Sequence, residues 1–74
     1  MIKTEIYTHE SWSNYDCFDE VLKYVNILIK KEHIKRSDIL EYRTKNWSTT
    51  EKNDVRWHYE VTISYWVDME EEDD

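Results

Sequence analysis

The stretch from Val55 to Val67 constrains the fold of this 74-residue chain most strongly, because apolar and polar residues alternate along it. The apolar positions are Val55, Trp57, Tyr59, Val61, Ile63, Tyr65 and Val67. Alternation of period two over this length is typical of a strand with one buried face, and the β-branched and aromatic composition favours the same structure. We therefore predict a long strand here and take it as the centre of a sheet.

The length and the cysteine content limit the class of protein. A chain this short has room for one domain, which we place at residues 1–68, and a single core of this size supplies only about 3–5 kcal/mol. Cys17 is the only cysteine, so an intrachain disulfide is impossible and a reducing cytoplasm is the expected location. The sequence has no signal-peptide pattern and no apolar run of about 18 residues, so we expect a soluble protein with no membrane partner.

The net charge of −7 is concentrated at one end of the chain. Residues 69–74 hold five of the 17 acidic residues and none of the ten basic ones, which leaves 12 acidic residues in the remainder. We expect these six residues to form a disordered acidic tail, either as a solvated terminus or as a segment that docks on a basic partner. The candidate tail contacts are Glu70, Glu71 and Glu72. Direct nucleic-acid binding is disfavoured, because no basic stripe with interleaved aromatic residues is present.

The first half of the chain predicts a short strand followed by a helix. Residues 2–8 alternate weakly, and Ser13 with Asp16 has the spacing of a capping box, with Trp12 positioned to pack on Cys17 as a hydrophobic staple. The apolar residues that follow recur at helical spacing. They are Phe18, Val21, Leu22, Val25, Leu28 and Ile29. We expect this stripe to face the sheet.

Residues 38–50 are expected to form a second strand that joins the long strand through a loop at 51–54. This loop sets a register in which Thr50 lies opposite Val55. The other pairs are then Leu40 with Tyr65, Tyr42 with Ile63, Thr44 with Val61, Lys45 with Glu60, and Trp47 with His58. A two-residue turn at Asn53 and Asp54 is the alternative, but it loses the pairing of Lys45 with Glu60.

The predicted order is strand, helix, strand, strand, which is a small α+β two-layer sandwich. A right-handed crossover makes the first two strands parallel, and the long third strand lies between them, antiparallel to both. That strand should span roughly 43 Å, against about 30 Å for the helix. We therefore expect the sheet to overhang the helix near the hairpin tip, with Val55 in the overhang and Trp57 either there or in the core.

Aromatic residues predict an interface on the sheet face turned away from the helix. We place Tyr7, Trp47, His58 and Trp66 on this face, and expect a homodimer joined through it or through the hairpin arm. Trp47 and Trp66 are the expected anchors of a protein interface, although simple cross-strand packing and a small-molecule pocket are alternatives. Together with Trp57 and the acidic tail, these residues are the candidate partner-binding set.

No motif in the sequence predicts catalysis or a bound cofactor. Nucleophile-elbow, phosphate-loop and zinc-protease patterns are missing, and the chain contains no glycine to form a flexible phosphate loop. His9, His33 and His58 have no recognised metal spacing, so we expect no metal. Cys17 follows acidic Asp16, which opposes a reactive thiolate and favours a packing role.

Several short segments resemble a family of small sporulation-associated proteins of spore-forming bacteria, which also has phage-encoded relatives. They are residues 2–7, 25–29, 38–42 and the final alternating strand through Tyr65. The resemblance implies the same fold and a bacterial or phage source. Our leading hypothesis is a non-enzymatic protein-binding module, encoded by a phage, that inhibits a host or anti-phage defence protein by occlusion. The alternatives are a self-associating structural or regulatory protein of sporulating cells and a protein that sequesters a small molecule.

Overall fold

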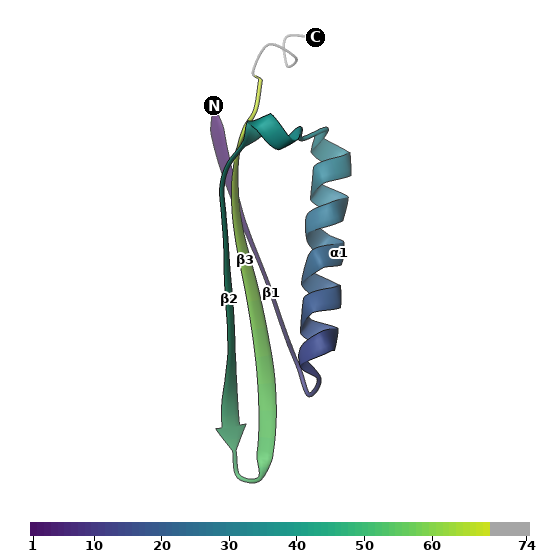
Figure 1. Cartoon of the computed structure of the whole chain (residues 1–74), viewed down its shortest axis with the longest axis vertical. Coiled ribbons are helices and arrows are strands. Elements are labelled where there is room, and N and C mark those ends of the chain that lie inside the picture. Colours follow the sequence, from purple (N-terminus) through teal and green to yellow (C-terminus); the bar gives the residue numbers. More distant parts are fainter. Residues whose placement is uncertain (69–74) are drawn as a thin grey trace.

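The computed structural model describes residues 1–68 and confirms the predicted α+β architecture (Figure 1). Its elements are β1 (Ile2–Ser11), α1 (Asn14–Glu32), the short 3₁₀ helix η1 (Arg36–Asp38), β2 (Ile39–Glu51) and β3 (Asp54–Trp66). The sheet order is β1-β3-β2, and β3 is antiparallel to both neighbours. The proposed acidic tail, with Glu70, Glu71 and Glu72, lies outside the described residues.

The register of the β2–β3 hairpin agrees with the prediction along most of its length. Thr50 lies opposite Val55, and the predicted loop closes further through a pair between Glu51 and Asp54. The turn is therefore two residues long, and Lys52 adopts φ 59°, the positive value that primed hairpin turns require at this position. The prediction for Leu40 was wrong, because a bulge between Ile39 and Glu41 brings Ile39 opposite Tyr65 instead.

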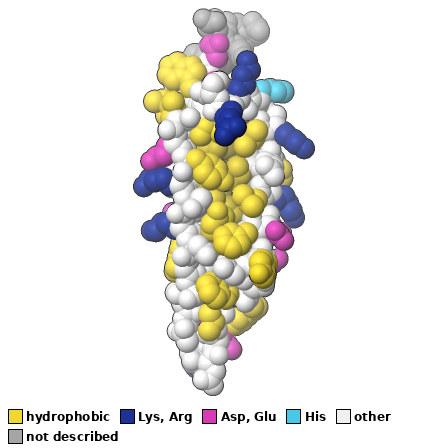
Figure 2. All heavy atoms as spheres, viewed as in Figure 1, with side chains coloured by type: hydrophobic (Ala, Val, Ile, Leu, Met, Phe, Trp, Pro, Cys, Tyr) yellow, Lys and Arg dark blue, Asp and Glu magenta, His cyan; other side chains and the backbone are white. Residues whose placement is uncertain are grey.

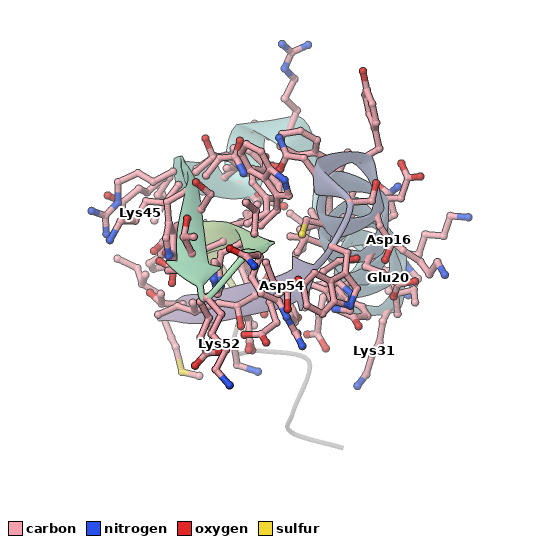
Figure 3. The ribbon with its side chains drawn as sticks, turned by 90° about the horizontal axis from the view of Figure 1, so that it is seen from below. Asp16, Glu20, Lys31, Lys45, Lys52 and Asp54 are labelled. Carbon is pink, nitrogen blue, oxygen red and sulfur yellow. The ribbon has the colours of Figure 1, made fainter. Side chains whose placement is uncertain are left out.

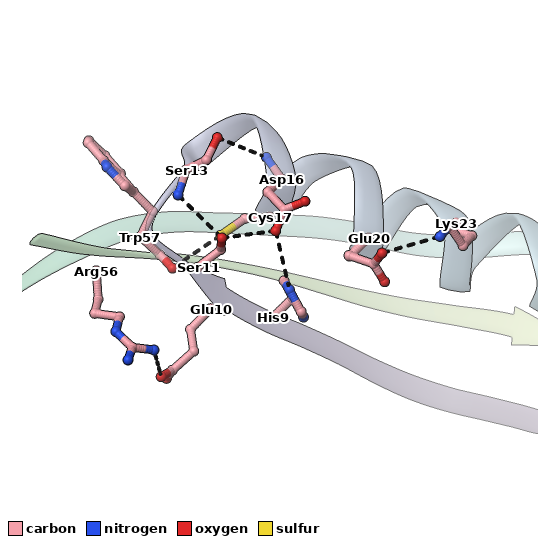
Figure 4. Close-up of polar contacts among 10 residues, drawn as sticks. All are labelled: His9, Glu10, Ser11, Ser13, Asp16, Cys17, Glu20, Lys23, Arg56 and Trp57. Atoms are coloured by element: carbon pink, nitrogen blue, oxygen red, sulfur yellow. Dashed lines mark hydrogen bonds and ion pairs between the residues drawn. The ribbon is translucent and has the colours of Figure 1, made fainter.

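Helix α1 begins at the predicted cap, although the capping box is only half formed. The Asp16 backbone N–H donates to Ser13 Oγ at 3.4 Å, as expected for a cap. The Asp16 carboxylate, however, accepts from the Ser11 hydroxyl at 2.9 Å, and Ser11 Oγ in turn accepts from the Ser13 N–H at 3.3 Å (Figure 4). Ser11, the last residue of β1, thus links the strand to the helix start.

The core lies between α1 and the central strand β3. The fully or nearly buried side chains are Cys17, Val21, Val25 and Leu28 from the helix and Tyr59, Val61, Ile63 and Tyr65 from β3. Leu22 is 42% exposed, so its place in the predicted stripe was wrong. Trp12 is also exposed, and the Arg56 guanidinium lies over its ring. The helix therefore begins at the Ser13 cap, while the Trp12 side chain is largely exposed to solvent.

The helix covers β1 and β3 but leaves β2 exposed. A helix is about 10 Å wide and strands are spaced about 4.8 Å apart, so one helix covers roughly two strands. Every residue of β2 after Ile39 is exposed. In the view of Figure 2, apolar side chains form a band between the hairpin and the helix, and this band is visible at the surface.

The sheet extends beyond the helix at the hairpin end, as predicted (Figure 1). The molecule is elongated, with a longest extent of 55 Å. Val55 is 41% exposed in this overhang. Trp57 occupies the core, the other place predicted for it: its side chain packs against the core cluster of Cys17 and Tyr59, because β1 extends to Ser11 and pairs with β3 as far as Trp57.

Candidate functional site

A polar and aromatic cluster crosses all three strands on the sheet face turned away from the helix. We define it as the His58 patch, made of Glu10, Trp47, Thr49, Arg56 and His58. The register places Glu10 of β1 and Trp47 of β2 on either side of His58 in β3, so these three side chains form one row across the sheet. Residues far apart in the sequence therefore meet through strand pairing alone.

The His58 ring is held from several directions. It stacks on the Trp47 ring with centroids 5.1 Å apart and an interplanar angle of 4°. Its Nε2 lies 2.9 Å from Thr49 Oγ1 in a hydrogen bond, and its Nδ1 lies 3.8 Å from Glu10 Oε1. The stack and the hydrogen bond fix the imidazole plane, so the two rings form a preformed aromatic pair in which Trp47 is the more exposed member.

Charged groups surround this aromatic pair. Arg56 donates to Glu10 Oε2 at 2.9 Å, and its guanidinium lies 4.2 Å from the centroid of the Trp12 ring. The Lys45 ammonium lies 5.7 Å from the Trp47 ring centroid. Seen along the long axis, Lys45 lies on the opposite side of the molecule from Asp16, Glu20 and Lys31 of the helix (Figure 3). The patch therefore combines an apolar centre with a rim of both charge signs.

The patch borders a shallow depression of about 420 Å³. Its lining residues are Thr8, His9, Glu10, Trp47, His58 and Glu60. Pockets that enclose drug-sized ligands are mostly apolar and bury most of the ligand, whereas this depression is open and mixed in polarity. Its shape suits a side chain or loop of a larger partner better than a small molecule.

Thr49, His58 and Glu10 lie next to one another in space in the same order as the nucleophile, base and orienting acid of some acyl-transfer enzymes. The 3.8 Å between His58 Nδ1 and Glu10 Oε1 exceeds hydrogen-bond range, so the carboxylate does not fix the imidazole tautomer as an orienting acid does. Thr49 donates or accepts in a single bond on an exposed strand. The geometry favours a recognition surface over this chemistry.

Of the predicted contact residues that lie within residues 1–68, the structure brings together Trp47 and His58. Trp66 lies on the same face and is 52% exposed, but it pairs with Ile2 at the far end of the sheet. At about 3.3 Å per residue, it is roughly 26 Å along β3 from His58. Trp57 lies on the other face, and Glu70, Glu71 and Glu72 are outside the described residues.

The placement of Tyr7 on the open face was wrong. Tyr7 lies opposite Val61 on the face that packs against the helix, and its ring centroid is 6.0 Å from that of Tyr24 in α1. The open-face row of β1 instead contains Ile2, Thr4 and Ile6. Burial raises the pKa of the Tyr7 hydroxyl, with smaller contributions from the Glu5 and Glu32 carboxylates.

Sequence reasoning missed three members of the patch: Glu10, Thr49 and Arg56. The available signal was the length of the first strand, since a strand that continues to Ser11 carries Glu10 to a position opposite His58. Thr49 lies two residues after Trp47 on the same face of β2. Polar residues near a turn resemble ordinary loop residues, and only the pairing register reveals that they converge.

Cys17 is fully buried, in agreement with its predicted packing role. Its thiol donates to the Trp57 carbonyl oxygen at 3.1 Å (Figure 4). Burial raises the pKa of the thiol, and the Asp16 carboxylate raises it further. A neutral thiol with a satisfied hydrogen bond is a structural group in this fold.

A second depression, of about 510 Å³, lies between β1 and α1. Its lining residues are Glu5, Tyr7, Tyr24, Ile27, Leu28, Lys31 and Glu32. Apolar and aromatic walls here are edged by two carboxylates and one ammonium group. This depression is open to solvent and lies on the opposite side of the sheet from the His58 patch.

Comparison with models of protein families, with curated proteins and with solved structures finds no significant match to this chain. Among residues 1–68, no helix is long and apolar enough to cross a membrane. The resemblance to sporulation-associated proteins therefore remains a prediction from short sequence segments.

Proposed function

We propose that this chain is a protein-binding module whose recognition surface is the His58 patch. The observation that carries the proposal is the parallel stack of Trp47 and His58, which is held at 5.1 Å on an exposed sheet face. Aromatic side chains are enriched at the energetic centres of protein interfaces, and a fixed ring loses little entropy on binding.

The surroundings of the stack support a protein partner. Trp47 is 39% exposed, and the neighbouring groups Lys45, Glu10 and Arg56 supply both charge signs at the rim. An apolar centre with a polar rim is the ordinary anatomy of a protein interface. The mode of action we propose is occlusion of the partner's own contact surface, with a host or defence protein as the partner class that the phage-related resemblance suggests.

The test is affinity capture from a bacterial lysate with three forms of the chain. The intact protein and a Trp66→Ala variant should retain a common partner, because Trp66 lies on the same face but far from the patch. A Trp47→Ala variant should lose at least about 90% of it, since central aromatic anchors typically contribute 2 kcal/mol or more. Circular dichroism checks that all three forms are folded. Equal capture by all three forms would contradict the proposal.

Sequestration of a small molecule is a second candidate function, favoured by the depression between β1 and α1. Its tyrosine-lined wall and flanking Glu5, Lys31 and Glu32 suit an amphipathic ligand with a polar end. Native mass spectrometry of the purified chain should then show a bound species that a Tyr24→Ala variant loses. A bare polypeptide mass for the intact chain excludes this function.

A further inference from the structure

We propose that two copies of this chain associate through the edges of their β2 strands, antiparallel and centred on Trp47, to form one continuous six-stranded sheet. This inference goes beyond the proposed function, because it concerns a second copy of the chain paired along the backbone edge of β2 and not a different protein bound on the open face. It commits to one occupant for that edge, a second copy of the chain.

The first observation is that β2 is a long edge strand that the fold leaves uncovered. It runs for 13 residues, and all but the first are exposed. An exposed edge presents unpaired N–H and C=O groups that readily pair with another strand. The other edge, β1, is protected: the helix packs on it, and charged Lys3 and Glu5 point to its half-buried inner face.

The second observation is the charge pattern along β2. The row on the open face reads Glu41, Arg43, Lys45, Trp47, Thr49 and Glu51, with an acid at each end and both basic residues on one side of Trp47. The row on the helix side is uncharged and contains Tyr42, Thr44, Asn46, Ser48 and Thr50. Charge therefore decides which pairing registers are favourable on one face only.

In a two-fold antiparallel pair the axis passes through the same residue of both strands, so each possible centre can be tested against these charges. Centres at Arg43 or Lys45 place that cation opposite itself, and a centre at Thr44 places the two cations opposite each other. A centre at Asn46 places Glu41 opposite Glu51. Like charges directly opposite each other are destabilising.

The centre at Trp47 avoids every such conflict. It places Arg43 opposite Glu51 of the second copy twice, Lys45 opposite Thr49 twice, and the two Trp47 side chains opposite each other. It pairs the whole stretch 43–51. A centre at Ser48 pairs only 45–51, and a centre at Tyr42 pairs 39–45 through the bulge between Ile39 and Glu41. Trp47 is thus the centre with the most paired residues and no opposed like charges.

This arrangement has a structural consequence for both faces. The two helices lie on one side of the joined sheet, and the two His58 patches meet at the two-fold axis on the other. In the monomer the Glu41 carboxylate lies 2.9 Å from Arg43 Nε. Because this ion pair is exposed to solvent and contributes little, Arg43 can contact Glu51 of the second copy in place of Glu41 or together with it.

The test measures the solution mass of the full chain by analytical ultracentrifugation at concentrations up to about 100 µM. The unchanged protein should be dimeric. Arg43→Glu and Glu51→Arg should each weaken dimerisation about tenfold or more, because each turns two symmetric attractions into repulsions. The double variant R43E/E51R should return the dissociation constant to within about threefold of the original.

Two controls define what would overturn the proposal. Lys23→Glu makes the same charge change on the helix as Arg43→Glu does on β2, and it should leave the mass unchanged. Rescue of Glu51→Arg by Lys45→Glu instead of Arg43→Glu would indicate the centre at Ser48 and overturn the register. A monomeric unchanged chain, or a dimer that none of the β2 charge variants weakens, would overturn the pairing itself. Capture of a partner by monomeric protein leaves the proposed function standing, so the two proposals fail separately.

Discussion

The two edge strands, β1 and β2, flank the same central strand, but the helix lies over only one of them. Tyr7 of β1 and Thr44 of β2 both lie opposite Val61, yet Tyr7 packs against the core whereas Thr44 is exposed. The difference follows from the width of one helix, which covers two strands of three. Equivalent positions on β1 and β2 therefore contribute differently to the free energy of unfolding, and the position on β2 is the one left exposed for binding.

The largest expected effect is on stability and compares these two flanking positions. Tyr7→Ala should lower the free energy of unfolding by about 2–4 kcal/mol, because it removes a ring packed on Tyr24 and on both core clusters. Thr44→Ala should change it by less than about 0.5 kcal/mol. Urea unfolding followed by circular dichroism measures both values. Similar losses for the two variants would show that β2 is covered in solution.

The pH dependence of stability should also report on the covered side. The pKa of Cys17 is raised above its ordinary value of 9.0 by burial and then by Asp16, so the folded thiol stays neutral at a pH where the unfolded thiol ionises. Tyr65 is raised above 10.0, first by burial and then by the Glu32 and Glu5 carboxylates.

Stability should therefore be fully retained below pH 9 and fall as the pH rises above it, by at most about 1.4 kcal/mol per pH unit for each group. Urea unfolding between pH 7 and pH 11 measures this loss. A Cys17→Ala variant should lose the part of the slope that begins near pH 9. A slope that is unchanged in this variant would assign the effect to the tyrosines.

A smaller effect is expected at the start of the helix that covers β1. Ser13→Ala removes the side-chain acceptor of the Asp16 N–H and should cost about 1 kcal/mol. Ser13→Asp keeps an acceptor and should stay within about 0.5 kcal/mol of the original. Thermal unfolding of both variants gives the comparison, and equal losses would contradict a capping role.

The smallest expected effect concerns the contact between the helix and the exposed strand β2. Asn14 and Asn46 exchange amide hydrogen bonds at 3.3 and 2.9 Å, and the Asn46 amide also donates to the His58 carbonyl. Asn14→Ala should cost about 0.5–1 kcal/mol, because the pair is exposed to water. Hydrogen exchange of β2 amides should quicken more than that of β1 amides. The reverse order would show that this pair supports the covered side.

Much of the fold could be predicted from the sequence, and the site only in part. The long alternating strand, the helix cap at Ser13 and the pairing of Trp47 with His58 all follow from local patterns. The face of Tyr7 did not, because β1 has apolar residues in both rows and period two does not say which row meets the helix. That choice depends on the register with β3, in which Tyr7 lies opposite buried Val61.

The sequence by itself determined the element order and the hairpin register, because alternation and turn chemistry act between residues close in the chain. Only the tertiary structure decided that Glu10 and Arg56 meet at His58, that a bulge shifts Leu40, and that β2 stays uncovered. These features depend on the exact length of β1, on where one helix rests and on pairing across the sheet. Such long-range geometry leaves no periodic signal in the sequence, since it is set by how complete layers pack.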